Sequence, residues 1–284
     1  MKTMGEQSKI AWTDSTRAGV LQSRKTMSEY HNPKGTAFPF ACDKHPVCVI
    51  YVARYADGVA CYKRFMESLE KQSLQSFGLF ILYKGFPDID TMIEWHRFCN
   101  HADTSSCMIC DKGYDLTAYR IGAETVSAPV LVLFNTSSEL VASDALVKLT
   151  QYVSTGDAVG AFGSWESFQK KWWHRLFWPS FPNPHLRTNA FAIRRETFLR
   201  VWPKKCRTKI GCWMWESGYG GFTRRLKRAF VATRFDDNLR WPAWSRSGFR
   251  HCNELLLVED NQSRRYEKAN DEAKQRLVKA TWGL

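Results

Sequence analysis

The sequence has no uninterrupted apolar segment of the roughly 18–20 residues that a membrane-spanning helix needs. Its first 25 residues mix Lys, Arg, Asp and Glu, and they lack the apolar stretch of a secretory signal peptide. Both absences indicate a protein that acts in the cytoplasm or at the inner face of the membrane.

Three familiar nucleotide and nucleophile motifs are also missing. No GxGxxG follows the first expected strand, no GxxxxGK(S/T) occurs, and there is no GxSxG. Dinucleotide-binding domains and P-loop NTPases need a glycine-rich turn to hold phosphates, and α/β-hydrolases need the GxSxG turn for their serine. The sequence therefore disfavours these three classes.

Nine cysteines are scattered along the chain, and an odd number is a poor basis for a disulfide framework. Cys107 and Cys110 have the CxxC spacing of a zinc or redox site, but no second pair follows them. They also lie in an apolar run typical of a strand, where alternating side chains would separate the two sulfurs. We expect free, mostly buried thiols.

The composition is that of a basic, aromatic-rich globular protein. Lys and Arg number 41 against 28 Asp and Glu, a formal net charge of +13, and aromatic residues make up 14% of the chain. With 44% hydrophobic residues the chain can bury a sizeable core, which excludes wholesale disorder. The basic surplus suits phosphates, anionic membranes or nucleic acid.

Apolar runs alternate with helical patterns over residues 47–162. This order predicts an α/β fold, a mainly parallel sheet with helices on both faces and right-handed crossovers. Ligands of such sheets bind outside the carboxyl ends of the strands, so the loops there are the places to search. The expected strands are 47–53, 77–83, 106–110, 129–134 and 158–162, and the expected helices are 59–72, 89–101, 116–126 and 144–155.

The rest of the chain differs in character. Residues 1–46 are polar and unpatterned, and we expect a loosely ordered arm there. The main domain is expected over 47–258, with a ligand-binding half up to residue 162 and an aromatic and basic half from 163 onward. Trp213–Gly218 precedes a helix expected over 222–229, and a basic C-terminal helix is expected within 259–284.

Four short segments, in this order of elements, resemble the GT-A fold of nucleotide-sugar-dependent glycosyltransferases. They are Val49–Arg54 before a helix, Asp111–Arg120, Val130–Glu139, and Trp215–Gly218 followed by Phe222–Leu226. The resemblance is greatest to distant relatives of glycosyltransferase family 2 in bacterial surface-polysaccharide synthesis. It covers roughly residues 47–230.

The resemblance implies transfer of a sugar from a nucleotide-sugar donor to a hydroxyl of a glycan or lipid-linked glycan, in O-antigen, capsule or lipooligosaccharide synthesis. Glu216 matches the general base of inverting members; the alternative is a carboxylate favoured only by a helix N-terminus. The donor nucleotide is assigned to Ala53, Arg54, Lys84, Asp111, Tyr114 and Arg120; the donor sugar and phosphates to Asn135, Ser137, Arg187 and Arg246; and the acceptor to Trp165, Glu166 and Asn189.

Each of these assignments has a plainer alternative. The charged residues at strand ends can be solvated surface groups, the segment around Arg187 can be a structural turn, and Trp165 can belong to the core. These alternatives stay open at the level of sequence.

A metal site is one of two alternatives for the diphosphate. The positions that match the family's DxD motif hold the neutral residues Asn135 and Ser137, with Glu139 two residues further on. Carboxylates are the usual ligands of Mn²⁺ or Mg²⁺ at such a site. Either a cation binds weakly with help from Glu139 or Asp111, or Arg and Lys neutralise the diphosphate instead.

The segment Lys170–Trp178 interleaves basic and aromatic residues. Stacking on nucleic acid, contact with an anionic membrane and a core helix with a basic outer face are all open, and we favour the membrane. The C-terminal helix carries acidic residues too, so it can be a solvent face laced with salt bridges. A basic nucleic-acid-binding module and a non-catalytic GT-A scaffold are the rival functions.

Overall fold

The computed structural model describes residues 41–153, 157–169, 171–203, 206, 208–234, 239–240 and 256–283. All of them belong to one compact unit, Pro39–Leu284. Arg246, Lys170 and the expected arm up to residue 40 lie outside the described residues. No helix within the described ranges is both long and apolar enough to cross a bilayer.

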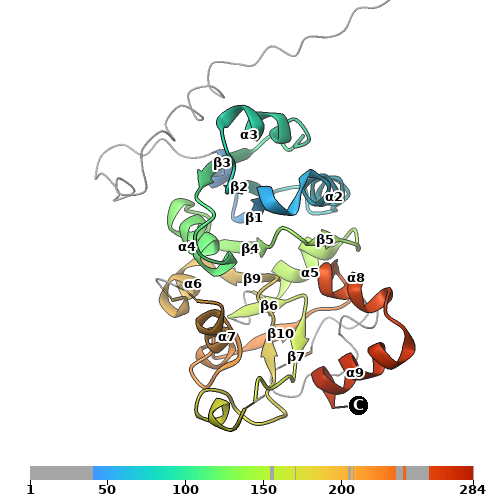
Figure 1. The fold of residues 1–284 in the computed structure, drawn as a ribbon. Helices are drawn as coiled ribbons and strands as arrows, with labels where there is room; N and C mark the ends of the chain where they lie inside the picture. Colours follow the sequence, from blue (N-terminus) through green and yellow to red (C-terminus); the bar gives the residue numbers. More distant parts are fainter. Residues whose placement is uncertain are drawn as a thin grey trace, which may run out of the picture. The chain divides into compact units, whose positions relative to one another are not determined.

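Four parallel strands form one half of the central sheet (Figure 1). They are β1 (Val47–Arg54), β2 (Gly78–Lys84), β3 (Thr104–Ile109) and β4 (Val130–Phe134), with β1 between β2 and β4. The residues of β2 and all but the two ends of β1 are buried. This burial explains why both strands are continuous apolar runs in the sequence.

Helices connect these strands as expected, but they end earlier. They are α2 (Val59–Glu70), α3 (Ile89–His96), α4 (Asp115–Thr125) and α5 (Ala145–Gln151). The largest difference is in α3, which ends five residues before the predicted residue 101. Its start is defined by Asp88, whose side chain accepts from the Thr91 N–H at 2.7 Å.

The second half adds shorter strands to the same sheet. These are β6 (Ala158–Gly160), β9 (Ala190–Arg194), β10 (Ala229–Val231) and β11 (Leu239–Arg240), and the full order is β11-β10-β6-β9-β4-β1-β2-β3. Strand β9 runs antiparallel to both β4 and β6. Its first residues therefore lie at the edge where β4 and β6 end.

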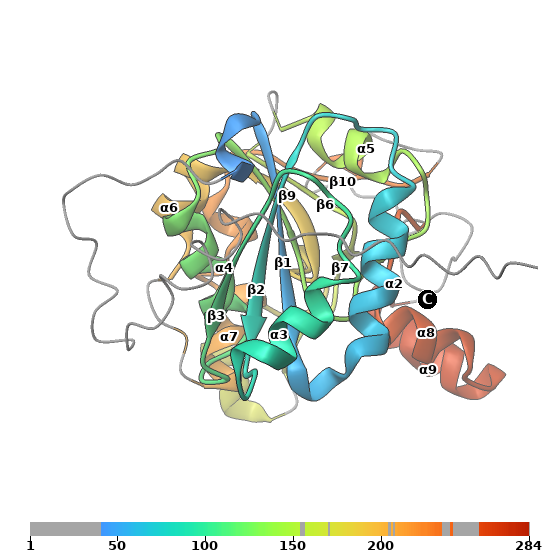
Figure 2. The same ribbon diagram turned by 90° about the horizontal axis from the view of Figure 1, so that it is seen from above.

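Helices cover both faces of the sheet. Helices α4, α6 (Arg195–Val201) and α7 (Lys209–Ser217) lie on one face, and α2, α5 and α8 (Asn261–Glu267) lie on the other (Figures 1 and 2). The predicted α/β class with a mainly parallel sheet is thus confirmed.

Two predictions about the second half are wrong. The segment expected as a helix over 222–229 is a short 3₁₀ turn, η5 (Thr223–Arg225), followed by β10, because residues 229–231 pair with β6. Trp213–Gly218 does not precede a helix: Glu216 lies in the last turn of α7. That helix is capped at its start by Thr208, whose side chain accepts from the Gly211 N–H.

The C-terminal segment contains two helices where one was expected. Asp260 and Ser263 form a capping box at the start of α8, and Asn270 caps α9 (Asp271–Trp282). Strand β12 (Val258–Glu259) pairs antiparallel with β5 (Glu139–Leu140). This pairing attaches the C-terminal helices to the segment that follows β4.

Two further expectations are corrected. Cys206 and Cys212 form a disulfide, whereas the other cysteines among the described residues are not disulfide-bonded. Residues 41–44 form the 3₁₀ turn η2, in which Cys42 is fully buried against β2, so the loosely ordered arm does not extend to residue 46. A Cβ on Gly78 would clash with the Cys42 carbonyl oxygen, which shows how closely the two backbones approach.

Candidate functional site

Polar residues gather along the carboxyl edge of the sheet in two groups. The strand-end cluster consists of Arg54, Lys84 and Asp111, which lie at the ends of β1, β2 and β3. The cavity cluster consists of Glu166, His185, Arg187 and Glu216, which surround a cavity beyond β9. The turn that follows β4 lies between them in the strand order.

The strand-end cluster is closely bonded. Arg54 donates from Nε to Asp111 Oδ1 and from Nη2 to Asp111 Oδ2, both at 2.8 Å. Lys84 Nζ lies 3.3 Å from Asp111 Oδ1 and donates to the Gly113 carbonyl oxygen at 2.8 Å. Arg54 and Lys84 are register partners in the parallel pair of β1 and β2, which brings both cations to one place.

The charges of this cluster are balanced. The hydrogen bond from Arg54, helped by Lys84, outweighs burial and lowers the pKa of Asp111 to about 2. Arg54 also lies 3.6 Å from Asp57. Because the carboxylates neutralise the cations, the cluster suits the hydroxyl and amide groups of a ligand better than its phosphates.

The other residues assigned to the nucleotide differ in position. Ala53 is fully buried in β1, and the ring of Tyr114 is exposed just before α4. Arg120 does not reach the strand ends: it donates to Glu124 Oε1 at 2.6 Å and to the Leu199 carbonyl oxygen at 2.8 Å, which joins α4 to α6. We therefore remove Arg120 from the candidate site.

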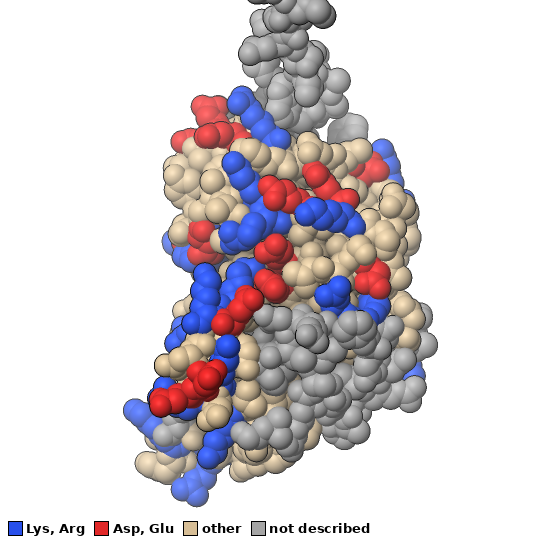
Figure 3. All heavy atoms as spheres, turned by 90° about the vertical axis from the view of Figure 1, so that its right-hand side faces the viewer, with Lys and Arg blue, Asp and Glu red and all other residues tan. Residues whose placement is uncertain are grey.

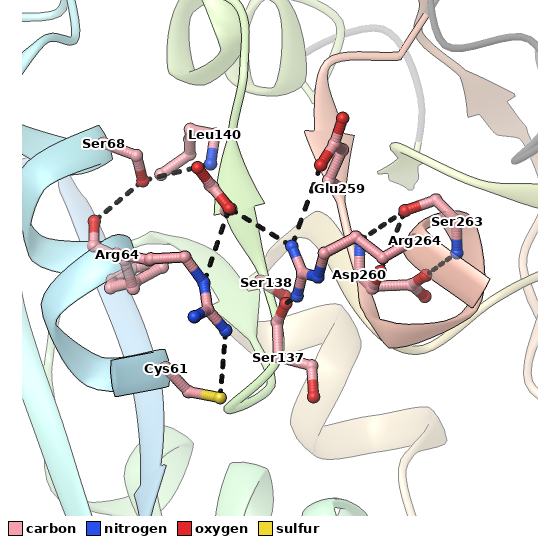
Figure 4. A network of polar contacts seen from close by, with 12 residues as sticks. Cys61, Arg64, Ser68, Ser137, Ser138, Leu140, Glu259, Asp260, Ser263 and Arg264 are labelled. Atoms are coloured by element: carbon pink, nitrogen blue, oxygen red, sulfur yellow. Dashed lines mark hydrogen bonds and ion pairs between the residues drawn. The ribbon is translucent and has the colours of Figure 1, made fainter. Parts of the chain in front are cut away.

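The turn after β4 is held by its own side chains. Asn135 Oδ1 accepts from the Ser137 N–H at 3.2 Å and from Ser138 Oγ at 2.9 Å. Glu139 Oε2 lies 3.7 Å from Arg64 Nε and accepts from Arg264 Nη1 at 3.2 Å. In Figure 4, Arg64 from α2 and Arg264 from α8 approach this segment from opposite sides.

These contacts do not fit a divalent cation at Asn135, Ser137 and Glu139. The Asn135 oxygen already accepts two hydrogen bonds, and the Glu139 carboxylate is neutralised by two guanidinium groups. Over the ranges that the structure describes, no group of three or more His, Cys, Asp or Glu is arranged to hold a metal ion. Hard cations need oxygen ligands that are free to coordinate them, so we derive no step through a metal.

A cavity of about 400 Å³ lies beyond β9, with α7 on one side and the C-terminal helices on the other. Its lining combines charged, polar and aromatic side chains. They include Glu166, Phe168, His185, Arg187, Asn189, Trp213, Glu216 and Tyr266. Three residues assigned from sequence to transfer and acceptor binding, Glu216, Glu166 and Asn189, thus meet in one cavity together with Arg187.

Arg187 bridges two carboxylates in this cavity. Its Nη1 donates to Glu216 Oε1 at 2.8 Å, and its Nη2 donates to Glu166 Oε2 at 2.7 Å. Thr188 Oγ1 donates to Glu216 Oε2 at 2.7 Å. Side-chain exposure is 14% for Glu216 and 32% for Glu166, so Glu216 is the more enclosed carboxylate.

The ionisation of the cavity cluster follows from these contacts. Burial raises the pKa of Glu216, but the charge of Arg187, with smaller effects of His185 and Thr188, outweighs it and lowers the pKa to about 2. Burial and Arg187 lower the pKa of His185 to about 4. Glu216 is therefore ionised and His185 neutral at pH 7.

Two buried nitrogen atoms of the cluster have no hydrogen-bond partner within the described part of the chain. They are His185 Nε2 and Arg187 Nε. His185 Nδ1 bonds with the Asn183 carbonyl oxygen at 2.7 Å, so the neutral ring carries its proton there and Nε2 is an acceptor. Buried polar atoms are rarely left without a partner, so both can bond with a ligand in the cavity.

The aromatic wall of the cavity is not the one expected. Trp165 does not line the cavity, since its ring packs edge-on against Trp282 at 5.7 Å. Phe168 and Trp213 line it instead, with ring centroids 4.3 Å apart. Asn189 also lines the cavity; its carbonyl oxygen accepts from the Asn135 N–H at 3.0 Å, and its amide donates to Asp260.

Sequence reasoning missed His185, Thr188 and Phe168. His185 and Thr188 lie within two residues of Arg187, just before β9. They reach the carboxyl edge of the sheet because β9 runs antiparallel to β4, and the sequence does not show this direction. Tyr266 was missed because its helix comes to the cavity only through the pairing of β12 with β5.

No protein-family model matches the chain, and no curated protein is similar to it at a significant level. Among solved structures it is similar to S. aureus TarS (residues 1–349), with a TM-score of 0.44, 9% identity and coverage of 65% of this chain and 57% of that one. The chain thus spans little more than half of that TarS structure. A 4-diphosphocytidyl-2C-methyl-D-erythritol synthase from Anaerococcus prevotii has a TM-score of 0.43, 8% identity and coverage of 64% and 92%. The mannosyltransferase PcManGT from Pyrobaculum calidifontis, in complex with GDP-Man and Mn²⁺, has a TM-score of 0.39, 15% identity and coverage of 66% and 55%.

Proposed function

We propose that the protein is a glycosyltransferase that moves a sugar from a nucleotide-sugar donor to a hydroxyl group of an acceptor bound in the cavity. The observation that carries this proposal is the bridge from Glu216 through Arg187 to Glu166 inside a polar and aromatic cavity at the carboxyl edge of the sheet. A carboxylate can deprotonate an attacking hydroxyl, and aromatic rings suit the apolar faces of sugars.

The strand order supports a donor that lies along this edge. Strand β4 separates β1 from β9, and neighbouring strands lie about 4.8 Å apart, so β1 and β9 are about 10 Å apart across the sheet. We assign the nucleoside to Arg54, Lys84, Asp111 and Tyr114 with the backbone of Ala53, and the transferred sugar to Asn135, Ser137 and the cavity. The diphosphate then lies near Arg187.

Glu216 is our candidate for the general base. A carboxylate with a pKa of about 2 is a weak base, and base strength rises with pKa. When Arg187 turns to the diphosphate of the donor, Glu216 loses its main opposing charge and burial raises its pKa. Donor binding thereby prepares the base, and Arg187 stabilises the negative charge that develops on the leaving group without a metal. A base on the acceptor side fits inversion at the anomeric carbon.

The acceptor in this proposal is a glycan, and the resemblance to family 2 relatives points to cell-surface polysaccharide such as O-antigen, capsule or lipooligosaccharide. Glu166 and Asn189, with Phe168 and Trp213, are placed to contact it. Hydroxyl-rich ligands pair with such carboxylates and amides while their apolar faces lie on the rings.

The test is calorimetry with UDP, GDP, CDP and dTDP, followed by transfer assays with sugars of the preferred nucleotide. We expect one nucleotide to bind without added Mn²⁺. The Glu216→Gln variant should keep that affinity and lose transfer by at least about a hundredfold, in the range of general-base catalysis. Glu196→Gln, an exposed carboxylate on α6, is the matched control and should transfer normally. Absence of nucleotide binding would overturn the proposal, and normal turnover in Glu216→Gln would remove this residue from the mechanism.

A second candidate is a domain of the same fold that binds its ligand without transfer. The pairing of Glu216 with Arg187 favours it, because a carboxylate whose pKa an ion pair lowers is a weak base. Wild-type protein that binds a nucleotide sugar but neither hydrolyses nor transfers it, over the whole acceptor panel, would establish this second function.

A further inference from the structure

Large apolar side chains are exposed on the segment after the cavity residue Phe168. In the 3₁₀ turn η4 (Trp172–Leu176), Trp172 is 73% exposed and Leu176 is 66% exposed. Phe177 follows them, and Ile210 and Tyr219, on and just after α7, are exposed as well. We call these five residues the apolar face. Contiguous exposed apolar surface marks a binding surface rather than ordinary solvent contact.

Residue contacts and both ribbon views show that the parts of this face lie together. The Tyr219 N–H donates to the Phe177 carbonyl oxygen at 3.1 Å. The ring of Phe168, which precedes η4, packs on Trp213 of α7. In Figures 1 and 2 the yellow turn of η4 lies beside α7 in both orientations. The face therefore draws on two segments that adjoin at Phe177 and Tyr219.

The region that carries this face has an extreme charge. Residues 167–234 contain sixteen Lys and Arg and two carboxylates, Glu196 and Glu216. Glu216 is neutralised by Arg187 in the cavity. Lys171 and Arg175 flank Trp172, and Lys209 precedes Ile210. Lys171, Arg175 and Lys209 are exposed beside the apolar side chains, so an anionic partner that also accepts apolar groups suits this surface.

The face around α2 and α8 is a useful contrast. Figure 3 shows blue Lys and Arg groups interspersed with red Asp and Glu groups there. Ion pairs such as Arg264 with Glu139 and Glu259 account for part of this pattern. The C-terminal helices therefore do not provide a second cationic surface.

The apolar face also borders the cavity. Phe168 and Trp213 connect it to one wall. The segment that follows η4 also reaches the C-terminal helices. The exposed ring of Phe181 packs against Gly283 at the end of α9, so closely that a Cβ on Gly283 would lie 2.5 Å from that ring. Leu277 and Ala280 of the same helix line the cavity.

We propose that the apolar face binds the surface of an anionic lipid bilayer. Trp172, Leu176 and Phe177 enter the headgroup region, and Lys171, Arg175 and Lys209 contact lipid phosphates. Nucleic acid fits less well, because Leu176 and Ile210 have no ring on which a base can stack. Binding in this orientation places the cavity beside the membrane surface and selects an acceptor anchored in lipid. The choice of acceptor rests on the proposed function, but the membrane binding does not.

The test is co-sedimentation of the full chain with vesicles of phosphatidylcholine alone and with about 30% phosphatidylglycerol. We expect the wild type to bind only the anionic vesicles. The double variant Trp172→Ser/Leu176→Ser loses buried apolar area, and Lys171→Glu/Arg175→Glu loses positive charge near the surface. Each should bind on the order of tenfold more weakly. The matched controls are Phe98→Ser/Val147→Ser, exposed apolar residues elsewhere, and Arg265→Glu/Lys268→Glu on α8 and at its end. Both controls should bind like the wild type.

Several outcomes would overturn the proposal: no binding to anionic vesicles, equal loss in the controls, or salt-sensitive binding of single-stranded DNA or RNA that the same substitutions abolish. Nucleotide affinity, measured on the same variants, should stay unchanged. A wild-type protein that binds anionic vesicles but no nucleotide would refute the proposed function and leave the membrane proposal standing.

Discussion

Arg187 donates a 2.8 Å hydrogen bond to Glu216 inside the cavity, and this contact keeps a buried carboxylate ionised. The pair comes from segments 29 residues apart, one before β9 and one at the end of α7. The same guanidinium also donates to Glu166, so one side chain bridges both carboxylates.

The first prediction concerns the pH dependence of this pair. In the wild type the pKa of Glu216 falls from 4.5 to about 2 on folding, so its contribution to stability is present above pH 4.5 and lost as the pH falls toward 2. In Arg187→Met the burial that raises the pKa of Glu216 remains, whereas the charge that lowers it is gone. The pKa of Glu216 in the folded variant therefore lies above its unfolded value, and the ionised carboxylate destabilises the fold. That variant should be less stable by about 3–5 kcal/mol at pH 7, and should recover part of the difference as the pH falls and Glu216 takes up a proton.

Urea unfolding of Arg187→Met at pH 7 and pH 5 checks this prediction. Arg200→Met, an exposed position on α6, is the control and should unfold like the wild type at both pH values. A constant difference between Arg187→Met and wild type over this range would show that Glu216 is not the group that titrates.

The second prediction concerns Gly85, which follows β2 with φ of +73°. A Cβ there would lie 2.8 Å from Asp111 Cβ, so Gly85→Ala must displace Asp111 from Arg54 and Lys84. Gly58 also has positive φ, but a Cβ at this position would meet nothing within 4 Å. Both substitutions should destabilise the fold by about 1–3 kcal/mol through the backbone. Only Gly85→Ala should also weaken nucleotide binding, which calorimetry measures. Equal nucleotide affinities of Gly85→Ala and Gly58→Ala would argue against the strand-end cluster as a ligand site.

The third prediction concerns Lys84, which is buried and bonds with Asp111 and the Gly113 carbonyl oxygen. Lys84→Met keeps the apolar stem but leaves that oxygen without its charged donor. The loop 111–114 should lose its position, and nucleotide affinity should fall on the order of tenfold, the loss expected for a hydrogen bond to a charged group. The exposed Lys71 provides the control as Lys71→Met. Isothermal calorimetry on both variants measures the difference, and unchanged affinity in Lys84→Met would exclude this role.

The fourth prediction concerns Arg264, through which α8 contacts Glu139, Glu259 and the Ser137 carbonyl oxygen (Figure 4). Arg264→Met removes these contacts, so amide exchange should increase over 261–282, where the C-terminal helices form a wall of the cavity. The KM for acceptor should rise more than the KM for donor. Arg265→Met, exposed on the same helix, should leave both unchanged. Hydrogen exchange that is equal in the two variants would mean that Arg264 does not hold α8 in place.

The strands of the first half were predictable because each is an apolar run bounded by turn residues. Burial on both faces requires such runs, so β1, β2 and β4 were found to within a few residues. The second half was harder. Strand β10 has three residues and takes its conformation from pairing with β6, a contact between residues about 70 positions apart that leaves no local pattern.

The candidate site divides in the same way. Arg54, Lys84 and Asp111 could be placed together in advance, because parallel strands end at one edge and each residue lies at or just after the end of its strand. Arg120 looked equivalent in sequence, but the turn of α4 directs its side chain to the carbonyl groups of α6. Helical position alone could not show which way that side chain points.

Chain order and residue type alone thus specified the layered α/β architecture, since hydrophobic periodicity is a local property that each segment carries. The cavity, the bridge formed by Arg187 and the role of the C-terminal helices depended on packing between distant segments. Strand β9 enters the sheet antiparallel, and β12 returns the end of the chain to β5. Hydrogen-bond pairing between strands brings these side chains together, and no stretch of neighbouring residues encodes it.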